Sequence, residues 1–300
     1  MDNQMMLKTT GLCKSYGKKE VLSNIDITIN KGDIYGLVGR NGAGKTTIMR
    51  ILTGLQMPTS GSIEYGFDNK RLGSIGSLVE LPSIYSNKSA EENIKYQYLN
   101  LGLKFDDSIY KTLEFVGLHT TGKKPVSKFS LGMRQRLGIA MAIVGDPDLL
   151  ILDEPINGLD PQGIIGVRNL LIKLNREKGM TIVISSHILS ELSKLATRYG
   201  FIDGGRIIRE ATESDVEHTS EKIMLLSADN FEVLCQKLVE EGYKAEVVSH
   251  PGKITLHGDA NIADIAIFAK TNGFNITDIK TDDSDLENFY VGLVGGKQNG

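Results

Sequence analysis

The sequence contains only two cysteines, Cys13 and Cys235, and they stand far apart along its 300 residues. So wide a separation excludes the close spacing of zinc ligands, and so low a count excludes a disulfide framework. We therefore expect both side chains to be reduced thiols, as is usual in a cytosolic protein.

Long apolar runs are also lacking: the stretch LGIAMAIVG at 137–145 is far too short to span a bilayer. The polar start MDNQMMLKTT carries an early acid, which is wrong for a signal peptide. The net charge is only −3, so no general surface for polyanions is indicated. We expect a soluble chain that binds no nucleic acid, and any membrane part of its machinery would be another protein.

What the sequence does have is 40% apolar residues, enough for one large domain or for a large and a small one. Strand patterns alternate with helical patterns as far as about residue 210, which predicts a mostly parallel α/β sheet. An all-helical insertion is predicted at 87–145, opened by the capping box SAEE at 89–92. A helix after the strand at 180–186 is predicted to end near Gly200, before a hairpin turn at Gly204 and Gly205.

After Arg209 the sequence turns polar and then starts again as a strand. The predicted order from residue 222 is βαββαβ, the split βαβ pattern of ferredoxin-like domains, followed by a short helix. We therefore divide the chain into a domain at 1–212 and an accessory domain at 220–300.

The stretch GRNGAGKT at 39–46 follows a predicted strand and opens a predicted helix, the context that a phosphate-binding P-loop requires. Its backbone N–H groups can cradle phosphate oxygens, Lys45 can reach the β- and γ-phosphates of ATP, and the Thr46 hydroxyl can bind Mg²⁺. The alternative is a glycine-rich turn with a surface lysine, which leaves the agreement of all eight positions unexplained. The predicted nucleotide-binding residues of this stretch are Gly39, Asn41, Gly42, Ala43, Gly44, Lys45, Thr46 and Thr47.

Two acids, Asp153 and Glu154, end the apolar run LLILDEP, where unpaired charge is costly. They could simply mark a strand that ends in a turn. If their strand lies parallel to the one before the P-loop, however, both strands end at the same edge of the sheet, beside a magnesium-bound triphosphate. Asp153 would then hold the metal directly or through water, and Glu154 would act as general base on the attacking water.

The stretch SKFSLGMRQR at 127–136 places Ser130 as a helix N-cap, which with Gly132 offers a second anion site. Here the residues resemble those of the ATP-binding-cassette ATPases. SLGMRQR is similar to the signature of that family, although Leu131 and Met133 depart from the usual Ser-Gly-Gly-Gln. The order of motifs matches too, since LLILDEP, NGLD at 157–160 and an SSH that ends at His187 follow. The resemblance covers about residues 5–210.

This resemblance implies a P-loop fold with a helical signature subdomain, and it assigns roles by position. Tyr16 would stack on adenine, and His187 would contact the γ-phosphate as a catalytic residue. Ser130 and Gly132 would contact the γ-phosphate bound to a second copy, so that the working unit would be a head-to-tail dimer around two ATP molecules. As alternatives, Tyr16 is an ordinary strand-face residue and His187 a structural one.

The family normally places a glutamine after a strand like the one at 75–80, whereas this sequence has Glu80 there. With the Pro, Tyr and Glu-Asn that follow, this variant is similar to the ATPases of bacterial bacitracin-type and lantibiotic self-protection exporters. We expect Glu80 to lie near the nucleotide, as a ligand of Mg²⁺ or a contact of the permease. A solvated turn acid is the plainer alternative.

Together these features predict the ATPase subunit of a bacterial exporter with a separate permease, peripheral on the cytoplasmic face of the membrane. It would confer immunity or resistance to a peptide antibiotic, which it would meet only through the permease. One alternative is a soluble single-cassette protein with a regulatory, ribosomal or nucleic-acid role, although such chains usually carry two cassettes or a long coiled coil. Another is a nucleotide-binding regulatory subunit without turnover, against which the complete set of predicted catalytic residues argues.

Overall fold

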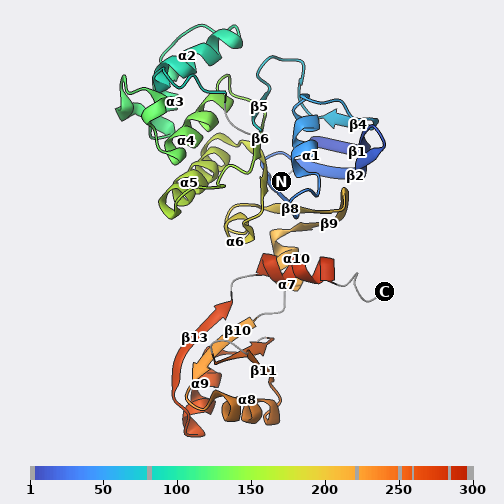
Figure 1. The fold of residues 1–300 in the computed structure, drawn as a ribbon, viewed down its shortest axis with the longest axis vertical. Coiled ribbons are helices and arrows are strands. Elements are labelled where there is room, and N and C mark those ends of the chain that lie inside the picture. The colour runs from blue at the N-terminus through green and yellow to red at the C-terminus, as the bar shows by residue number, and fades with distance from the viewer. Residues whose placement is uncertain are drawn as a thin grey trace. The chain divides into compact units, whose positions relative to one another are not determined.

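The computed structural model describes residues 4–79, 83–219, 223–248, 252–258, 260–282 and 285–295. The chain divides into two compact units, Met1–Glu213 and Ser214–Gly300 (Figure 1). Among the described residues, the first unit contains two sheets and the second contains one, and each unit has its own core. In the described ranges, no helix combines the length and the apolar character needed to cross a bilayer.

The first unit is built around a six-stranded sheet in the order β5-β6-β7-β3-β8-β9. Neighbouring strands from β5 to β8 are parallel, and β9 runs antiparallel to β8. Every residue of β3, β6 and β7 is buried, as expected for strands that are covered on both faces. The predicted parallel α/β sheet is confirmed. Its strands are β3 (Ile34–Val38), β5 (Ile75–Leu78), β6 (Leu149–Asp153), β7 (Thr181–Ser186), β8 (Arg198–Asp203) and β9 (Arg206–Thr212).

A separate antiparallel sheet, in the order β2-β1-β4, lies beside helix α1 (Figure 1). It consists of β1 (Met5–Tyr16), β2 (Lys19–Asn30) and β4 (Ser60–Tyr65). Helix α1 (Lys45–Leu52) contributes Ile48 and Met49 to a core cluster that also contains Leu22 of this sheet and Leu37 of the six-stranded sheet. The helix that follows the P-loop therefore packs in one core with residues of both sheets.

Helices α2, α3 and α4 gather on one side of the unit, away from the antiparallel sheet (Figure 1). The predicted capping box is confirmed, since the Ser89 side chain accepts from the Glu92 N–H and the Glu92 carboxylate accepts from the Ser89 N–H. Strand β5 runs directly against the end of α4: a methyl group on Gly76 would lie 2.1 Å from the carbonyl oxygen of Ala142. The helices are α2 (Ala90–Asn100), α3 (Ser108–Phe115), α4 (Leu131–Ala142), α5 (Pro161–Lys178) and α6 (Leu189–Leu192), with 3-10 turns at His119–Thr121 and Val126–Lys128.

The prediction of a helix that reaches Gly200 is wrong. Helix α6 ends at Leu192, and Gly200 lies inside strand β8, paired with Leu37 of β3. Pairing with β3 explains the difference, and the close packing requires glycine here, because a methyl group on Gly200 would lie 2.1 Å from the hydroxyl oxygen of Tyr35. That hydroxyl donates to a carboxylate oxygen of Glu210 at 2.8 Å, and burial raises the pKa of Tyr35 well above its usual range. Pairing with β3 thus makes residues 198–203 a strand, although the local sequence favours a helix.

The second unit is a four-stranded antiparallel sheet in the order β11-β12-β10-β13. With the two helices that connect its strands it has the chain order βαββαβ, and the predicted ferredoxin-like fold is confirmed. Leu226, Leu234 and Ile254 are fully buried in its core. The polar stretch after Arg209, for which the sequence predicts no element, contains the end of β9 and helix α7. The elements are α7 (Glu213–Thr219), β10 (Ile223–Ala228), α8 (Phe231–Glu240), β11 (Lys244–Val248), β12 (Lys253–His257), α9 (Ile262–Thr271), β13 (Ile276–Asp282) and α10 (Asp285–Gly295).

Candidate nucleotide-binding site

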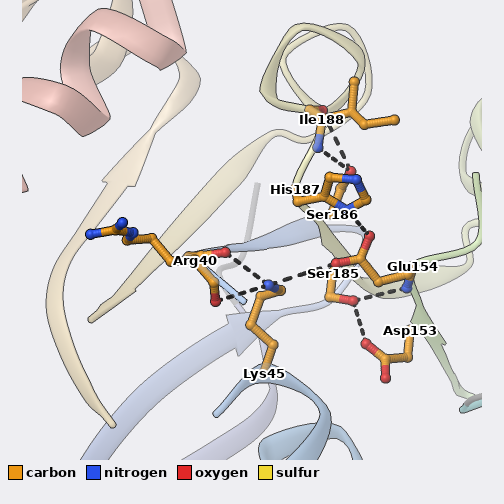
Figure 2. Close-up of polar contacts among 9 residues, drawn as sticks. Arg40, Lys45, Asp153, Glu154, Ser185, Ser186, His187 and Ile188 are labelled. Atoms are coloured by element: carbon orange, nitrogen blue, oxygen red, sulfur yellow. Dashed lines mark hydrogen bonds and ion pairs between the residues drawn. The ribbon is translucent and has the colours of Figure 1, made fainter. Parts of the chain in front are cut away.

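The P-loop joins the end of β3 to the start of α1 and forms one wall of a pocket of about 480 Å³. Lys45 is the first residue of α1 and is only 6% exposed. Its ammonium group donates to the carbonyl oxygens of Gly39 at 2.8 Å and Arg40 at 3.4 Å (Figure 2). The pocket lies at a helix N-terminus, where backbone N–H groups and the helix dipole favour phosphate. Its lining residues are Val21, Asn41, Gly42, Gly44, Lys45, Thr46, Thr47, Glu154, Asn157 and His187.

Two predicted loop residues are not part of this lining. Ala43 is 6% exposed, and its backbone N–H donates to the Arg40 carbonyl oxygen at 3.1 Å. Gly39 supplies a carbonyl oxygen to Lys45 instead of facing the pocket. Both residues therefore make hydrogen bonds within the loop, and neither lines the pocket.

The two acids at the end of β6 are oriented by one hydroxyl group. Asp153 is 8% exposed and pairs in register with Ser185 of β7. The Ser185 hydroxyl donates to Oδ1 of Asp153 at 2.5 Å and accepts from the backbone N–H of Glu154 at 2.9 Å (Figure 2). Burial of the Asp153 charge is thus compensated by a hydrogen bond from the neighbouring strand.

Glu154 adopts a left-handed backbone conformation, with φ at 51°, which is uncommon for a residue with a side chain. One carboxylate oxygen, Oε1, lies 3.6 Å from Nζ of Lys45, and the other, Oε2, lies 2.6 Å from Nδ1 of His187. Figure 2 shows the three side chains converging from the P-loop, the end of β6 and the end of β7. The Glu154 side chain is 23% exposed, so water can reach it. A carboxylate in this position can accept a proton from a water molecule that attacks a bound phosphate.

The predicted magnesium ligands are hard oxygen donors. Mg²⁺ usually takes one or two carboxylates and fills its other positions with water and substrate phosphates. Thr46, which carries a hydroxyl group, lines the pocket, whereas Asp153 is not one of its lining residues and accepts a hydrogen bond from Ser185. One hydroxyl and one carboxylate beside a triphosphate pocket fit this ion.

The signature residues lie elsewhere, in a second pocket of about 300 Å³ between α4 and α5. Ser130 and Gly132 line it, and the Ser130 hydroxyl accepts from the Met133 N–H at 3.2 Å as the N-cap of α4. Among the described residues the two pockets share no lining residue. The NGLD turn connects them, since Asn157 lines the first pocket and Asp160 the second. A single chain therefore does not bring the signature to Lys45.

The predicted adenine-stacking residue, Tyr16, is not part of the pocket lining either. Tyr16 ends β1, is 44% exposed, and donates its hydroxyl to Oε1 of Gln56 at 2.7 Å. The ammonium group of Lys14 lies 5.2 Å from the centre of its ring. The prediction for Glu80 lies outside the described residues.

The sequence prediction missed the contribution of Ser185 and the position of Val21 in the lining of the pocket. Only the place of Ser185 two residues before His187, in the SSH motif, could have indicated it. Val21 gives no signal in the sequence, because it reaches the pocket through the pairing of β1 with β2.

Comparison with known proteins shows the family of this chain. The ABC transporter domain family matches residues 22–157. Among curated proteins, the chain is 41% identical to the bacitracin transport ATP-binding protein BcrA of Bacillus licheniformis, over 97% of this chain and 98% of that protein. It is 49% identical to the lantibiotic transport ATP-binding protein SrtF of Streptococcus pyogenes, over 72% of this chain and 95% of that protein. The resemblance to bacitracin- and lantibiotic-type ATPases is confirmed.

A solved structure agrees with the fold. It is an ATP-binding cassette captured as a dimer in a post-hydrolysis state with ADP and Pi. It superposes with a TM-score of 0.61 at 24% identity, over 69% of this chain and 99% of that chain. At this identity the likeness concerns the fold alone. Fold, P-loop pocket and relatives together show that the chain is an ATP-hydrolysing subunit and belongs to the ABC transporter family.

Proposed function

We propose that the chain is the ATPase subunit of a bacterial exporter with a separate permease, and that it protects the cell against a peptide antibiotic of the bacitracin or lantibiotic type. The names of BcrA and SrtF support the substrate class. The observation that carries the enzymatic part is the carboxylate of Glu154, which contacts both Lys45 and His187 at the edge of the P-loop pocket. The subunit would work at the cytoplasmic face of the membrane, where the permease holds it.

In the proposed mechanism, the β- and γ-phosphates of ATP bind the N–H groups of the P-loop and the ammonium group of Lys45. Because phosphate carries more negative charge than one carboxylate, it attracts Lys45 away from Glu154. Glu154 then takes a proton from water as the water oxygen bonds to the γ-phosphorus. The bond to the bridging oxygen breaks, giving ADP and phosphate. His187 holds Glu154 through Oε2 and contacts the γ-phosphate with its other ring edge.

Thr46 and Asp153 are the proposed ligands of Mg²⁺, which would neutralise phosphate charge when it is bound. Tyr16 is the proposed adenine-stacking residue. Its ring is exposed, as a stacking platform must be, and the nearby Lys14 adds positive charge.

The active form is proposed to be a head-to-tail dimer. Ser130 and Gly132 line a pocket of their own, and the NGLD turn runs between this pocket and the P-loop. A second copy turned by 180° can place its signature pocket over the P-loop of the first. Each ATP would then lie between Lys45 of one chain and Ser130 of the other.

The permease is proposed to dock on a groove of about 690 Å³ between β5 and the helices α2 and α4. Exposed apolar side chains lie along it, among them Leu55, Leu72 and Tyr85. Val79 and Ser83, which flank Glu80 and its two successors in the sequence, also line the groove. This supports a role for Glu80 in communication with the permease. The domain at 220–300 is proposed to be regulatory or to contact the same partner.

The test is antibiotic tolerance in cells that express the chain with its permease. Wild type should raise the inhibitory concentration of bacitracin or of a lantibiotic, and Glu154→Gln at matched expression should not. Equal tolerance of the two strains would reject the proposal. Co-sedimentation of the chain with ribosomes instead of membranes would favour the alternative of a soluble single-cassette protein.

A further inference from the structure

Ser185 occupies a special place in the sheet, because its hydroxyl lies between the two acids of the site. It stands next to last in β7, fully buried, directly opposite Asp153 of β6. Its Oγ contacts the side chain of one acid and the backbone of the next. The proposed catalytic scheme gives this residue no role.

The direction of both hydrogen bonds follows from the chemistry of the partners. A backbone N–H can only donate, so Ser185 must accept from Glu154, and an ionised carboxylate can only accept, so Ser185 must donate to Asp153. The single hydroxyl proton is therefore directed at Asp153. A hydroxyl group that is fully buried and bonded in this way has one orientation.

The bond to Glu154 has a second consequence. Its backbone is left-handed at φ 51°, a conformation that persists in a non-glycine residue only when its surroundings hold it. The Ser185 hydroxyl supplies such a contact at the Glu154 N–H. The left-handed turn in turn directs the carboxylate toward the P-loop, where it lies 3.6 Å from Nζ of Lys45 and 2.6 Å from Nδ1 of His187.

We propose that Ser185 is a positioning residue for ATP hydrolysis: one hydroxyl holds the metal-binding carboxylate and the general base in a fixed mutual geometry. The inference rests on the proposed roles of Asp153 and Glu154. Groups that orient metal ligands typically change metal affinity or activity by about 10–100-fold when they are removed. Ser185 acts through the two acids and does not touch the nucleotide itself.

The competing explanation is that Ser185 stabilises the sheet and nothing more. Thr181, at the other end of the same strand, is a matched control. It is also fully buried, and its hydroxyl accepts from the backbone N–H of Gly32 at 3.0 Å, far along the strand from the acids. Thr181→Val removes one buried hydroxyl from β7, as Ser185→Ala does, without touching the site.

The experiment measures kcat, KM for ATP, the Mg²⁺ concentration for half-maximal ATP binding, and Tm for both variants and wild type. For Ser185→Ala we expect kcat to fall at least about tenfold, KM to stay within about twofold, and the Mg²⁺ requirement to rise about tenfold. Thr181→Val should lower Tm and leave the other three quantities near wild type. Ser185→Thr keeps the hydroxyl and should recover most of kcat; if it does not fold, Ser185→Cys, with its weaker donor, should give an intermediate value.

Two outcomes would overturn the inference: kcat and Mg²⁺ requirement of Ser185→Ala within about twofold of wild type, or equal losses in Thr181→Val. Failure of the proposed function would give a different result, because Glu154→Gln would then hydrolyse ATP at the wild-type rate. The Mg²⁺ requirement for binding is measured without hydrolysis, so it tests the link from Ser185 to Asp153 in either case.

Discussion

Glu154 has a contact at each of its carboxylate oxygens, and this makes its replacement informative. In Glu154→Gln the amide cannot accept a proton from water, so we expect hydrolysis to fall by about 10²-fold or more, the usual contribution of a general base. MgATP binding should be retained, because Lys45 and the P-loop are unchanged. Phosphate release and nucleotide titration measure the two effects.

The matched control is Glu177→Gln, on the surface of α5, where the carboxylate is 60% exposed and lies 3.8 Å from Lys173. It should hydrolyse ATP at the wild-type rate. Steady-state activity of Glu154→Gln near that of wild type would mean that another group takes the proton.

Site residues are predictable from the sequence where their chemistry is local. Lys45, Glu154 and His187 belong to recognisable motifs, and the structure brings the three together. The hydrogen bonds of Ser185 could not be predicted, because they depend on which strands are neighbours and in which register.

At the scale of elements, strand β5 packs with its backbone directly against the end of helix α4. Gly76→Ala would place a methyl group 2.1 Å from the Ala142 carbonyl oxygen and 3.0 Å from the ring of Pro147, so the backbone must shift. We expect a loss of about 1–3 kcal/mol in the free energy of unfolding, measured by denaturant titration. Gly166→Ala, inside α5 with open space around it, should be neutral or stabilising. Equal stability of the two variants would show that β5 and α4 separate easily.

The start of α2 predicts a pH dependence. The Ser89 backbone N–H, with Lys88 and the Ser89 hydroxyl, lowers the pKa of Glu92 from its ordinary value of 4.5. A lowered folded-state pKa stabilises the fold above the unfolded-state value, and this contribution is lost as the pH falls through the folded-state value. The Tm of wild type should therefore exceed that of Glu92→Gln near pH 7, and the difference should shrink below pH 4.5.

Glu91→Gln is the matched control, because the Glu91 carboxylate contacts Lys95 at 2.6 Å and takes no part in the capping box. Its Tm difference from wild type should be the smaller one at pH 7. A difference for Glu92→Gln that stays constant with pH would mean that the charge of Glu92 does not stabilise α2.

The elements of the chain were predictable where periodicity and capping agree, as at Ser89 and along β6. They were not predictable after Ser186, where the sequence indicates one long helix and the molecule forms the short α6 and the strand β8. That strand exists because it pairs with β3 and packs on Tyr35, partners more than 150 residues away in the chain. No local pattern contains this information.

For the whole molecule, the separation of the two pockets predicts that association depends on ATP. Glu154→Gln should be largely monomeric without nucleotide and dimeric with MgATP, as measured by light scattering. Adding Gly132→Asp should abolish the dimer, because a carboxylate in the signature pocket repels the γ-phosphate, while binding at the P-loop persists. A mass that does not change with ATP would contradict the shared-site mechanism.

The division of the chain into two units predicts a stable truncation. A chain that ends at Glu213 keeps every described residue of the P-loop pocket and of the signature pocket. We expect its Kd for MgATP to lie within about threefold of the value for the full chain. A change of about 1.4 kcal/mol in binding free energy would already change Kd tenfold. Circular dichroism checks that it is folded. A folded truncation that binds no ATP would show that the second unit helps to build the site.

The contact between Tyr35 and Gly200 also limits which substitutions can accumulate at these positions during evolution. The ring fills the space that a side chain at position 200 would need, and its hydroxyl is tied to Glu210. A lineage that gains a larger residue at 200 must first exchange Tyr35 for a smaller one, which leaves Glu210 without its donor. The three positions should therefore change together among descendants of this sequence, or not at all.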